Sequence, residues 1–151
     1  MKIKWKVLIL SLIIVFLVSA FGSLFTDTGG WYEEIRPTIT PPNYVFPIVW
    51  TILFILIALA LYFVWVNADK RDKLKVGIVF GINLVANALW TYLYFGLRNP
   101  LYAFYDIIII LVSIIIMIMV SWKISKKAAL LLIPYLLWVG FAAVLNYLSI
   151  K

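Results

Sequence analysis

Five long apolar segments alternate with short polar ones along this chain. They cover residues 5–25, 44–66, 74–96, 100–122 and 128–149. Each is close to the roughly 20 residues that a helix needs to cross the hydrocarbon core of a bilayer. Within them apolar and polar residues do not alternate, as they would in a transmembrane β-strand. The pattern predicts an all-α polytopic membrane protein, with a bundle of five spanning helices in a single domain over residues 1–151.

The composition excludes a soluble globular protein. Apolar residues make up 66% of the chain and charged residues 13%, whereas soluble domains have about 45–50% and about 25%. There is no cysteine and no histidine, which excludes disulfides, thiolate chemistry and histidine metal ligands. We therefore expect no metal site and no bound cofactor.

Basic residues gather in alternate polar segments. By the positive-inside rule this predicts that the N-terminus lies inside and the C-terminus outside, with segment 26–43 outside. Topology thus explains the net charge of +7 without a nucleic-acid partner. The inner set is Lys2, Lys4, Lys6, Lys70, Arg71, Lys73, Lys75, Lys123, Lys126 and Lys127, and the outer set is Arg36, Arg98 and Lys151.

The first apolar segment allows a second interpretation. Lysines before an apolar stretch that contains Val18-Ser19-Ala20 also resemble a secretory signal with a cleavage site. However, the apolar run continues through Phe25 and is long enough to span a membrane, which favours a spanning helix.

Segment 26–43 is the longest polar segment and is rich in proline and aromatic residues. Pro41 and Pro42 cannot lie inside a helix, because each lacks an N–H and its ring clashes with the preceding turn. The next helix is therefore expected to begin near Tyr44. We predict that 26–43, which carries Trp31 and Tyr32, lies over the mouth of the bundle as a lid.

The third apolar segment carries two amides on one helical face. At about 100° per residue, Asn83, Asn87, Trp90 and Tyr94 share that face. Buried amides are costly in a membrane unless they are satisfied. Two interpretations stay open: hydrogen bonds between helices, or the polar part of a pocket wall, which the aromatic residues on the same face favour.

Two further segments carry aromatic residues at helical spacing. Trp50 and Phe54 are one turn apart, and Trp138 is one turn from the small residue Ala142. Trp138 lies well inside its segment, away from the interface where tryptophan usually anchors a membrane helix. Such residues either fill space in the bundle or form the wall of a pocket for a flat, apolar ligand.

Two other features of the spans carry predictions. Gly77-x-x-x-Gly81 allows two helices to approach closely, which predicts a homodimer through this face, although packing within one chain uses the same motif. Asp106 is the only acidic residue within a predicted span. We expect it to be buried and paired with a neighbouring helix.

Four motifs in order resemble the translocator protein family, whose members are also called tryptophan-rich sensory proteins or peripheral benzodiazepine receptors. They cover nearly the whole chain. Some details differ from the usual pattern: Arg36 stands where lysine is common, Asn83 where glutamine is common, one residue fewer separates Tyr32 from Pro37, and the longer C-terminal tail of animal members is absent. The motifs are Trp31-Tyr32-x4-Pro37-x3-Pro41-Pro42, Val45-Phe46-x3-Trp50-Thr51, Asn87-x2-Trp90-x4-Phe95-Gly96 and Pro134-Tyr135-x2-Trp138-x2-Phe141-Ala142-x2-Leu145-Asn146-Tyr147.

The resemblance implies a five-helix bundle, commonly a homodimer, with an outward-opening cavity beneath the first loop. The family binds porphyrins such as protoporphyrin IX, isoquinoline carboxamides and benzodiazepines, and in animals cholesterol. Arg36 in the lid would meet a porphyrin propionate through a charge-assisted hydrogen bond. The expected ligand-binding residues are Trp31, Tyr32, Arg36, Pro42, Trp50, Phe54, Asn83, Asn87, Trp90, Trp138 and Ala142.

Three functions follow from the resemblance. The first is a membrane receptor or sensor for porphyrins and similar polycyclic ligands. The second is light- and oxygen-dependent porphyrin degradation, with Trp50 and Trp138 as electron donors, since no acid–base pair of side chains is visible. The third is transport of tetrapyrroles or sterol-like cargo. Whether the protein is an enzyme stays open. The richness in isoleucine and lysine suggests a bacterial plasma membrane.

Overall fold

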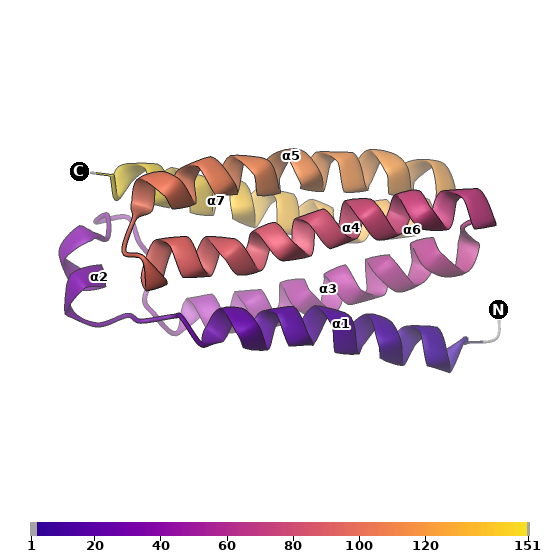
Figure 1. Cartoon of the computed structure of the whole chain (residues 1–151), viewed down its shortest axis with the longest axis horizontal. Coiled ribbons are helices and arrows are strands. Elements are labelled where there is room, and N and C mark those ends of the chain that lie inside the picture. The colour runs from indigo at the N-terminus through magenta and orange to yellow at the C-terminus, as the bar shows by residue number, and fades with distance from the viewer. Residues whose placement is uncertain (1–2, 151) are drawn as a thin grey trace.

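The structure is a computed structural model that describes residues 3–150 as a bundle of long helices lying side by side (Figure 1). Five spans are long and apolar enough to cross a membrane: α1, α3, α4 with η1, α5, and α6 with α7. This confirms the predicted all-α, five-span membrane protein. The elements are α1 (Trp5–Ser23), α2 (Gly30–Ile35), α3 (Val45–Asn67), α4 (Lys70–Thr91), the π-helix η1 (Tyr92–Gly96), α5 (Pro100–Ile124), α6 (Lys126–Leu131) and α7 (Ile133–Leu148).

Local sequence signals set the limits of the last two spans. The Asn99 side chain accepts a hydrogen bond from the Tyr102 N–H over 3.1 Å, and Pro100 occupies the first helical position, which needs no donor. Ser125 separates α5 from α6 and accepts from the Ala128 N–H. The fifth span is interrupted at Leu132, because Pro134 has no N–H to donate to the preceding turn.

The spans form a closed ring around a shared core. Helix α1 packs against α3 and α4, α5 packs against α4 and α7, and α3 closes the ring mainly through α6. The well-packed part of the core lies near the α3–α4 connection. Its largest fully buried side chains include Ile57, Val64, Phe80, Met117 and Leu132.

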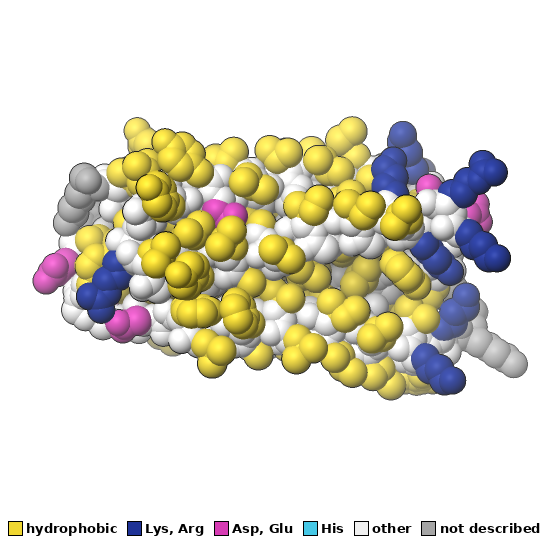
Figure 2. All heavy atoms as spheres, viewed as in Figure 1, with side chains coloured by type: hydrophobic (Ala, Val, Ile, Leu, Met, Phe, Trp, Pro, Cys, Tyr) yellow, Lys and Arg dark blue, Asp and Glu magenta, His cyan; other side chains and the backbone are white. Residues whose placement is uncertain are grey.

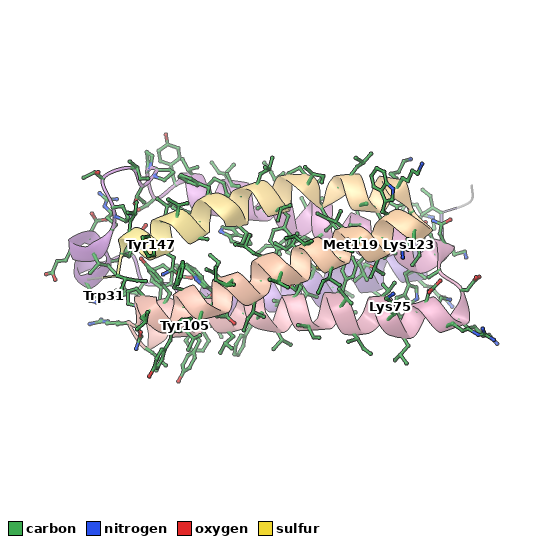
Figure 3. The ribbon with its side chains drawn as sticks, turned by 90° about the horizontal axis from the view of Figure 1, so that it is seen from above. Trp31, Lys75, Tyr105, Met119, Lys123 and Tyr147 are labelled. Carbon is green, nitrogen blue, oxygen red and sulfur yellow. The ribbon has the colours of Figure 1, made fainter. Side chains whose placement is uncertain are left out.

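The two ends of the bundle differ in charge. Lysine and arginine side chains cluster at the end where α1 begins, with some acidic side chains among them, whereas few basic side chains are visible at the other end (Figure 2). Trp31 and Tyr147 lie at the end opposite Lys75 and Lys123 (Figure 3). This sorting is the one on which the predicted orientation rests. The orientation itself, N-terminus inside and C-terminus outside, stays a prediction.

The glycines of the predicted dimer face lie on the outside of α4. A Cβ at Gly77 would meet only the Trp65 ring, at 3.8 Å, and a Cβ at Gly81 would have no neighbour within 4 Å. Neither glycine is therefore needed for close packing within the chain. The homodimer stays a prediction.

Candidate functional site

A cavity of about 480 Å³ occupies the half of the bundle nearest α2. All five spans and the segment between α1 and α3 contribute to its wall. It begins where the packed core ends, since Ile107 and Ile110 of α5 line it while Ile114, one turn further on, is fully buried. The loop residues Tyr32, Pro37 and Thr40 also line it. The predicted lid segment therefore lies over a cavity.

The structure separates the expected ligand-binding residues into two groups. Those that line the cavity are Tyr32, Trp50, Phe54, Asn87, Trp90 and Ala142. Those that lie elsewhere are Trp31, Arg36, Pro42, Asn83 and Trp138. Six of the eleven expected residues therefore line the cavity, and Trp138 is not among them.

A chain of hydrogen bonds forms the polar floor of the cavity. Asn87 donates from Nδ2 to the Tyr135 hydroxyl over 3.0 Å, and this hydroxyl donates to Oδ1 of Asn83 over 3.1 Å. Asn83 in turn donates from Nδ2 to Ser113 over 2.8 Å. Asn83 is fully buried, and both ends of its amide are used between helices. Its position fits the interhelical interpretation, whereas Asn87 serves both the network and the cavity wall.

A second set of hydrogen bonds holds the wall near the lid. Trp90 donates from Nε1 to Oδ1 of Asn146 over 2.9 Å, and Asn146 donates from Nδ2 to the Pro100 carbonyl over 2.8 Å. The Tyr94 hydroxyl donates to Ser149 over 2.9 Å. The rings of Trp90 and Tyr94 stack with centroids 4.9 Å apart. These contacts join α4 and η1 to α7 and to the start of α5.

The π-helix η1 places aromatic side chains under the lid. Tyr94 and Phe95 both line the cavity, and their rings contact the two lid aromatics: Trp31 lies 5.8 Å from Tyr94, and Tyr32 lies 5.7 Å from Phe95. π-Helical turns inside α-helices occur frequently at functional sites. Trp31 thus does not line the cavity itself but packs against Tyr94, which does.

Tyr32 is the most deeply buried residue of α2, with 7% of its surface exposed. Burial raises the pKa of its hydroxyl above the ordinary value, and the neighbouring Tyr94 adds to the rise. The side chain therefore faces the cavity as a neutral hydrogen-bonding group at physiological pH.

Polar contacts tie the lid segment together. Arg36 pairs with Glu33 over 2.8 Å, and Asn43 accepts from Arg36 and donates to Glu33, both over 3.4 Å. At the other end of the segment Arg98 lies 3.7 Å from Asp27. Arg36 is therefore engaged by a carboxylate within the lid.

Trp138 and Asp106 lie away from the cavity wall. The Trp138 ring packs between Phe46, at 5.9 Å, and Phe141, at 5.7 Å. Asp106 is buried as expected, with 4% of its surface exposed, but the expected pairing is wrong. Its Oδ2 has no hydrogen-bond partner among residues 3–150.

The contribution of α1 was not foreseen from the sequence. Val18, Ser19, Gly22 and Ser23 line the cavity. A Cβ at Gly22 would lie 3.1 Å from Oγ1 of Thr91, so the glycine allows α1 to approach α4 closely. The available signal was a stripe of small residues at helical spacing, because Ser11, Val15 and Gly22 are the buried residues of α1.

The site suits an apolar ligand with a few polar groups. Its walls are aromatic and aliphatic, and its polar groups are amides and hydroxyls. None of the cavity-lining residues carries a formal charge. Within residues 3–150 no group of three metal-ligating side chains comes together.

Comparisons with known proteins agree with this architecture. Residues 10–150 match the TspO/MBR family. The chain is 40% identical over 143 residues to the tryptophan-rich protein TspO of Archaeoglobus fulgidus, covering 93% of this chain and 92% of that protein. It is also 40% identical over 130 residues to the TspO of Chlorobaculum tepidum, covering 83% of this chain and 82% of that protein. The chain is 30% identical over 132 residues to the translocator protein of Homo sapiens, covering 83% of this chain and 78% of that protein.

These matches bear on location and broad function as well as on fold. The five apolar spans and the bacterial relatives support an integral protein of the bacterial cell membrane. The family match supports a membrane sensor or binding role. The match extends over nearly the whole chain, and it includes the residues of the cavity wall. The chain therefore belongs to the TspO/MBR family.

Proposed function

We propose that this protein is a membrane receptor that binds porphyrins, such as protoporphyrin IX, and similar polycyclic ligands in the lidded cavity. The observation that carries the proposal is the cavity itself, about 480 Å³ with Trp50, Phe54 and Trp90 in its wall and Asn87 at its floor. Ligand sites typically enclose about 300–1,000 Å³ and combine apolar walls with a few placed polar groups.

The absence of charge in the cavity wall supports a particular orientation of a porphyrin. The macrocycle would lie between the aromatic walls, and its propionates would point to the lid, where Arg36 is a candidate cation. Breaking the Arg36–Glu33 pair would then accompany binding. Isoquinoline carboxamides, which carry no formal charge, would bind without this exchange.

A titration of the purified protein with protoporphyrin IX tests the proposal. We expect saturable binding, seen as a shift of the porphyrin absorbance band, and competition by an isoquinoline carboxamide, because both ligands occupy one cavity. Saturable porphyrin binding without competition would place the porphyrin elsewhere. No saturable binding would overturn the proposal.

Porphyrin degradation is a second candidate, favoured by the position of Trp50. Its ring contacts the cavity and lies 6.2 Å from the ring of Tyr135, an arrangement suited to passing an electron from the protein to a photoexcited ligand. Trp138 lies outside the wall. Illumination in air with protoporphyrin IX should therefore give porphyrin loss that Trp50→Phe slows more than Trp138→Phe does. Loss no faster than in detergent alone would reject this candidate.

A further inference from the structure

An apolar groove lies on the outer surface between α3 and α7. It is lined by Val49, Ile52, Leu53, Pro134, Leu137 and Phe141, together with Trp138. Ile52 is 52% exposed and Leu137 is 69% exposed. Both belong to helices long and apolar enough to span a membrane, so we expect the groove to face lipid hydrocarbon. No polar residue lines the groove apart from the indole of Trp138.

The groove and the cavity lie on opposite sides of the same pair of helices. On α3, Phe46 and Trp50 line the cavity while Val49 and Leu53 line the groove. On α7, Val139 and Ala142 line the cavity while Trp138 and Phe141 line the groove. The two spaces are therefore separated only by the seam between α3 and α7.

Trp138 occupies that seam. Its ring lines the groove and lies 5.9 Å from the ring of Phe46, which lines the cavity. One aromatic contact thus connects the two spaces, and a rotation of the Trp138 side chain would change the thickness of the wall.

The Trp138 indole also has an unused donor. Its Nε1 is enclosed and has no hydrogen-bond partner among residues 3–150. The residue lies near the middle of the span Lys126–Leu148, where neither water nor lipid headgroups supply an acceptor. A ligand with a carbonyl, carboxyl or ring-nitrogen acceptor that passes the seam would satisfy this donor.

The helix that carries Trp138 has few contacts with α3 across the seam. The fifth span is interrupted at Leu132 by the proline that lines the groove, and such breaks act as hinges where a helix bends. Helix α3 packs closely against α1 and α6 and only slightly against α7.

We propose that the groove is a lipid-side binding site and entry portal for the cavity, with Trp138 as its gate. The ligand class is a flat, apolar polycycle with at least one hydrogen-bond acceptor, which dissolves in the bilayer before it binds. The lid, tied by the Arg36–Glu33 pair, then closes the aqueous end while the ligand crosses the seam. This inference rests on the proposed function, because it uses the same ligand and the same cavity.

The absence of cysteine from the chain provides a test. Ile52→Cys places a single thiol in the groove, and a bulky maleimide then blocks it. The matched control is Ile109→Cys on α5, which has the same residue type and nearly the same exposure, 53% against 52%, and lines neither space. Both labelled variants are reconstituted in lipid nanodiscs, and protoporphyrin IX fluorescence gives the association rate, the dissociation rate and the equilibrium affinity.

The portal predicts a purely kinetic effect. Labelling Ile52→Cys should slow association and dissociation together by about tenfold or more, with the affinity nearly unchanged, because a gate alters rates without altering end states. The labelled control should behave like wild type. Unchanged rates at Ile52→Cys with intact binding would overturn the portal and leave the receptor proposal standing. A wild-type protein that shows no saturable binding would overturn both.

Should Ile52→Cys fail to fold, Leu137→Cys tests the same groove from α7. The lid route is tested in parallel with Glu33→Gln, which removes the partner of Arg36. If the ligand enters from lipid, this variant should leave the association rate within about twofold of wild type, since the lid is not on the path. The tighter binding expected from the released Arg36 should then appear as slower dissociation. A large acceleration by Glu33→Gln would overturn the portal.

Discussion

The Trp90 indole donates a hydrogen bond to Oδ1 of Asn146 over 2.9 Å, from one side of the cavity wall to the other. The same Asn146 holds the first residue of α5 through its Nδ2. Trp90 therefore acts both as wall and as a tie between α4 and α7, and the cavity is held open by the bonds that surround it.

Replacing Trp90 by phenylalanine tests its role as a tie between α4 and α7, because it keeps an aromatic ring in the wall and removes the indole N–H. The ring remains, but Asn146, which is 1% exposed, loses the partner of its Oδ1. We expect a loss of about 1–2 kcal/mol in unfolding free energy, the usual cost of an unpaired buried acceptor, together with weaker porphyrin binding. Thermal unfolding in detergent measures the first effect. Trp122→Phe, with 48% of the residue exposed at the basic end, is the control and should change stability by less than about 0.5 kcal/mol.

The network under the cavity predicts a different outcome. Tyr135→Phe removes the hydroxyl that joins Asn87 to Asn83 but leaves the cavity lining in place. We expect a loss of about 0.6 kcal/mol, the average for a hydrogen bond between membrane helices, and at most about 1.7 kcal/mol. The change in porphyrin affinity should be smaller than the change that Asn87→Ala causes. An equal loss of affinity in both variants would mean that Asn87 acts only through the network.

Arg36 offers a test of how the ligand is oriented. In the proposed complex this side chain leaves Glu33 and meets a propionate. Arg36→Ala should weaken protoporphyrin IX binding by about tenfold, or about 1.4 kcal/mol, and should leave the affinity for its uncharged dimethyl ester unchanged. Glu33→Gln should strengthen binding of the acid alone. If Arg36→Ala affects the acid and the ester equally, the propionates do not reach the lid.

Tyr32 makes the lid sensitive to alkaline pH. Because the pKa of the buried hydroxyl is above its ordinary value of 10.0, the folded lid favours the neutral form. The stability that this provides is complete below pH 10 and is lost as the pH rises through the folded-state pKa. Limited proteolysis of the lid should accelerate above pH 10 in wild type. In Tyr32→Phe, which cannot ionise there, the acceleration should be smaller, and an identical pH profile would contradict the assignment.

The sequence predicted the spans well because each is a long apolar run, and hydrophobicity alone decides which segments cross a membrane. It also predicted much of the cavity wall, since Trp50 with Phe54 and Asn87 with Trp90 lie at helical spacing on faces that turn inward. The family motifs added Tyr32 and Ala142 to the expected ligand-binding residues, and both line the cavity. The spans and the inward-facing residues of each helix follow from the sequence of that helix alone, whatever the packing between helices.

What the sequence did not predict depends on how the helices are rotated against one another. Asn83 and Asn87 share a face, but one turn separates them, and this is enough to place Asn83 below the cavity floor. In the same way Ala142 lines the cavity while Trp138, one turn earlier, lies at the seam with α3. Helical spacing cannot distinguish such neighbours. It shows which residues share a helix face, but it does not show which of them lie at the level of the cavity. The short helix α2 and the π-helix η1 likewise depend on tertiary contacts of Tyr32 and Tyr94.

The most direct test of the account is to fill the cavity and measure porphyrin binding. Ala142→Phe places a ring inside the cavity, whereas Val144→Phe adds one to a side chain of the same helix that is 50% exposed and outside the lining. The account predicts that Ala142→Phe abolishes saturable protoporphyrin IX binding while Val144→Phe retains it, with both proteins folded by circular dichroism. Equal binding by the two variants would contradict it.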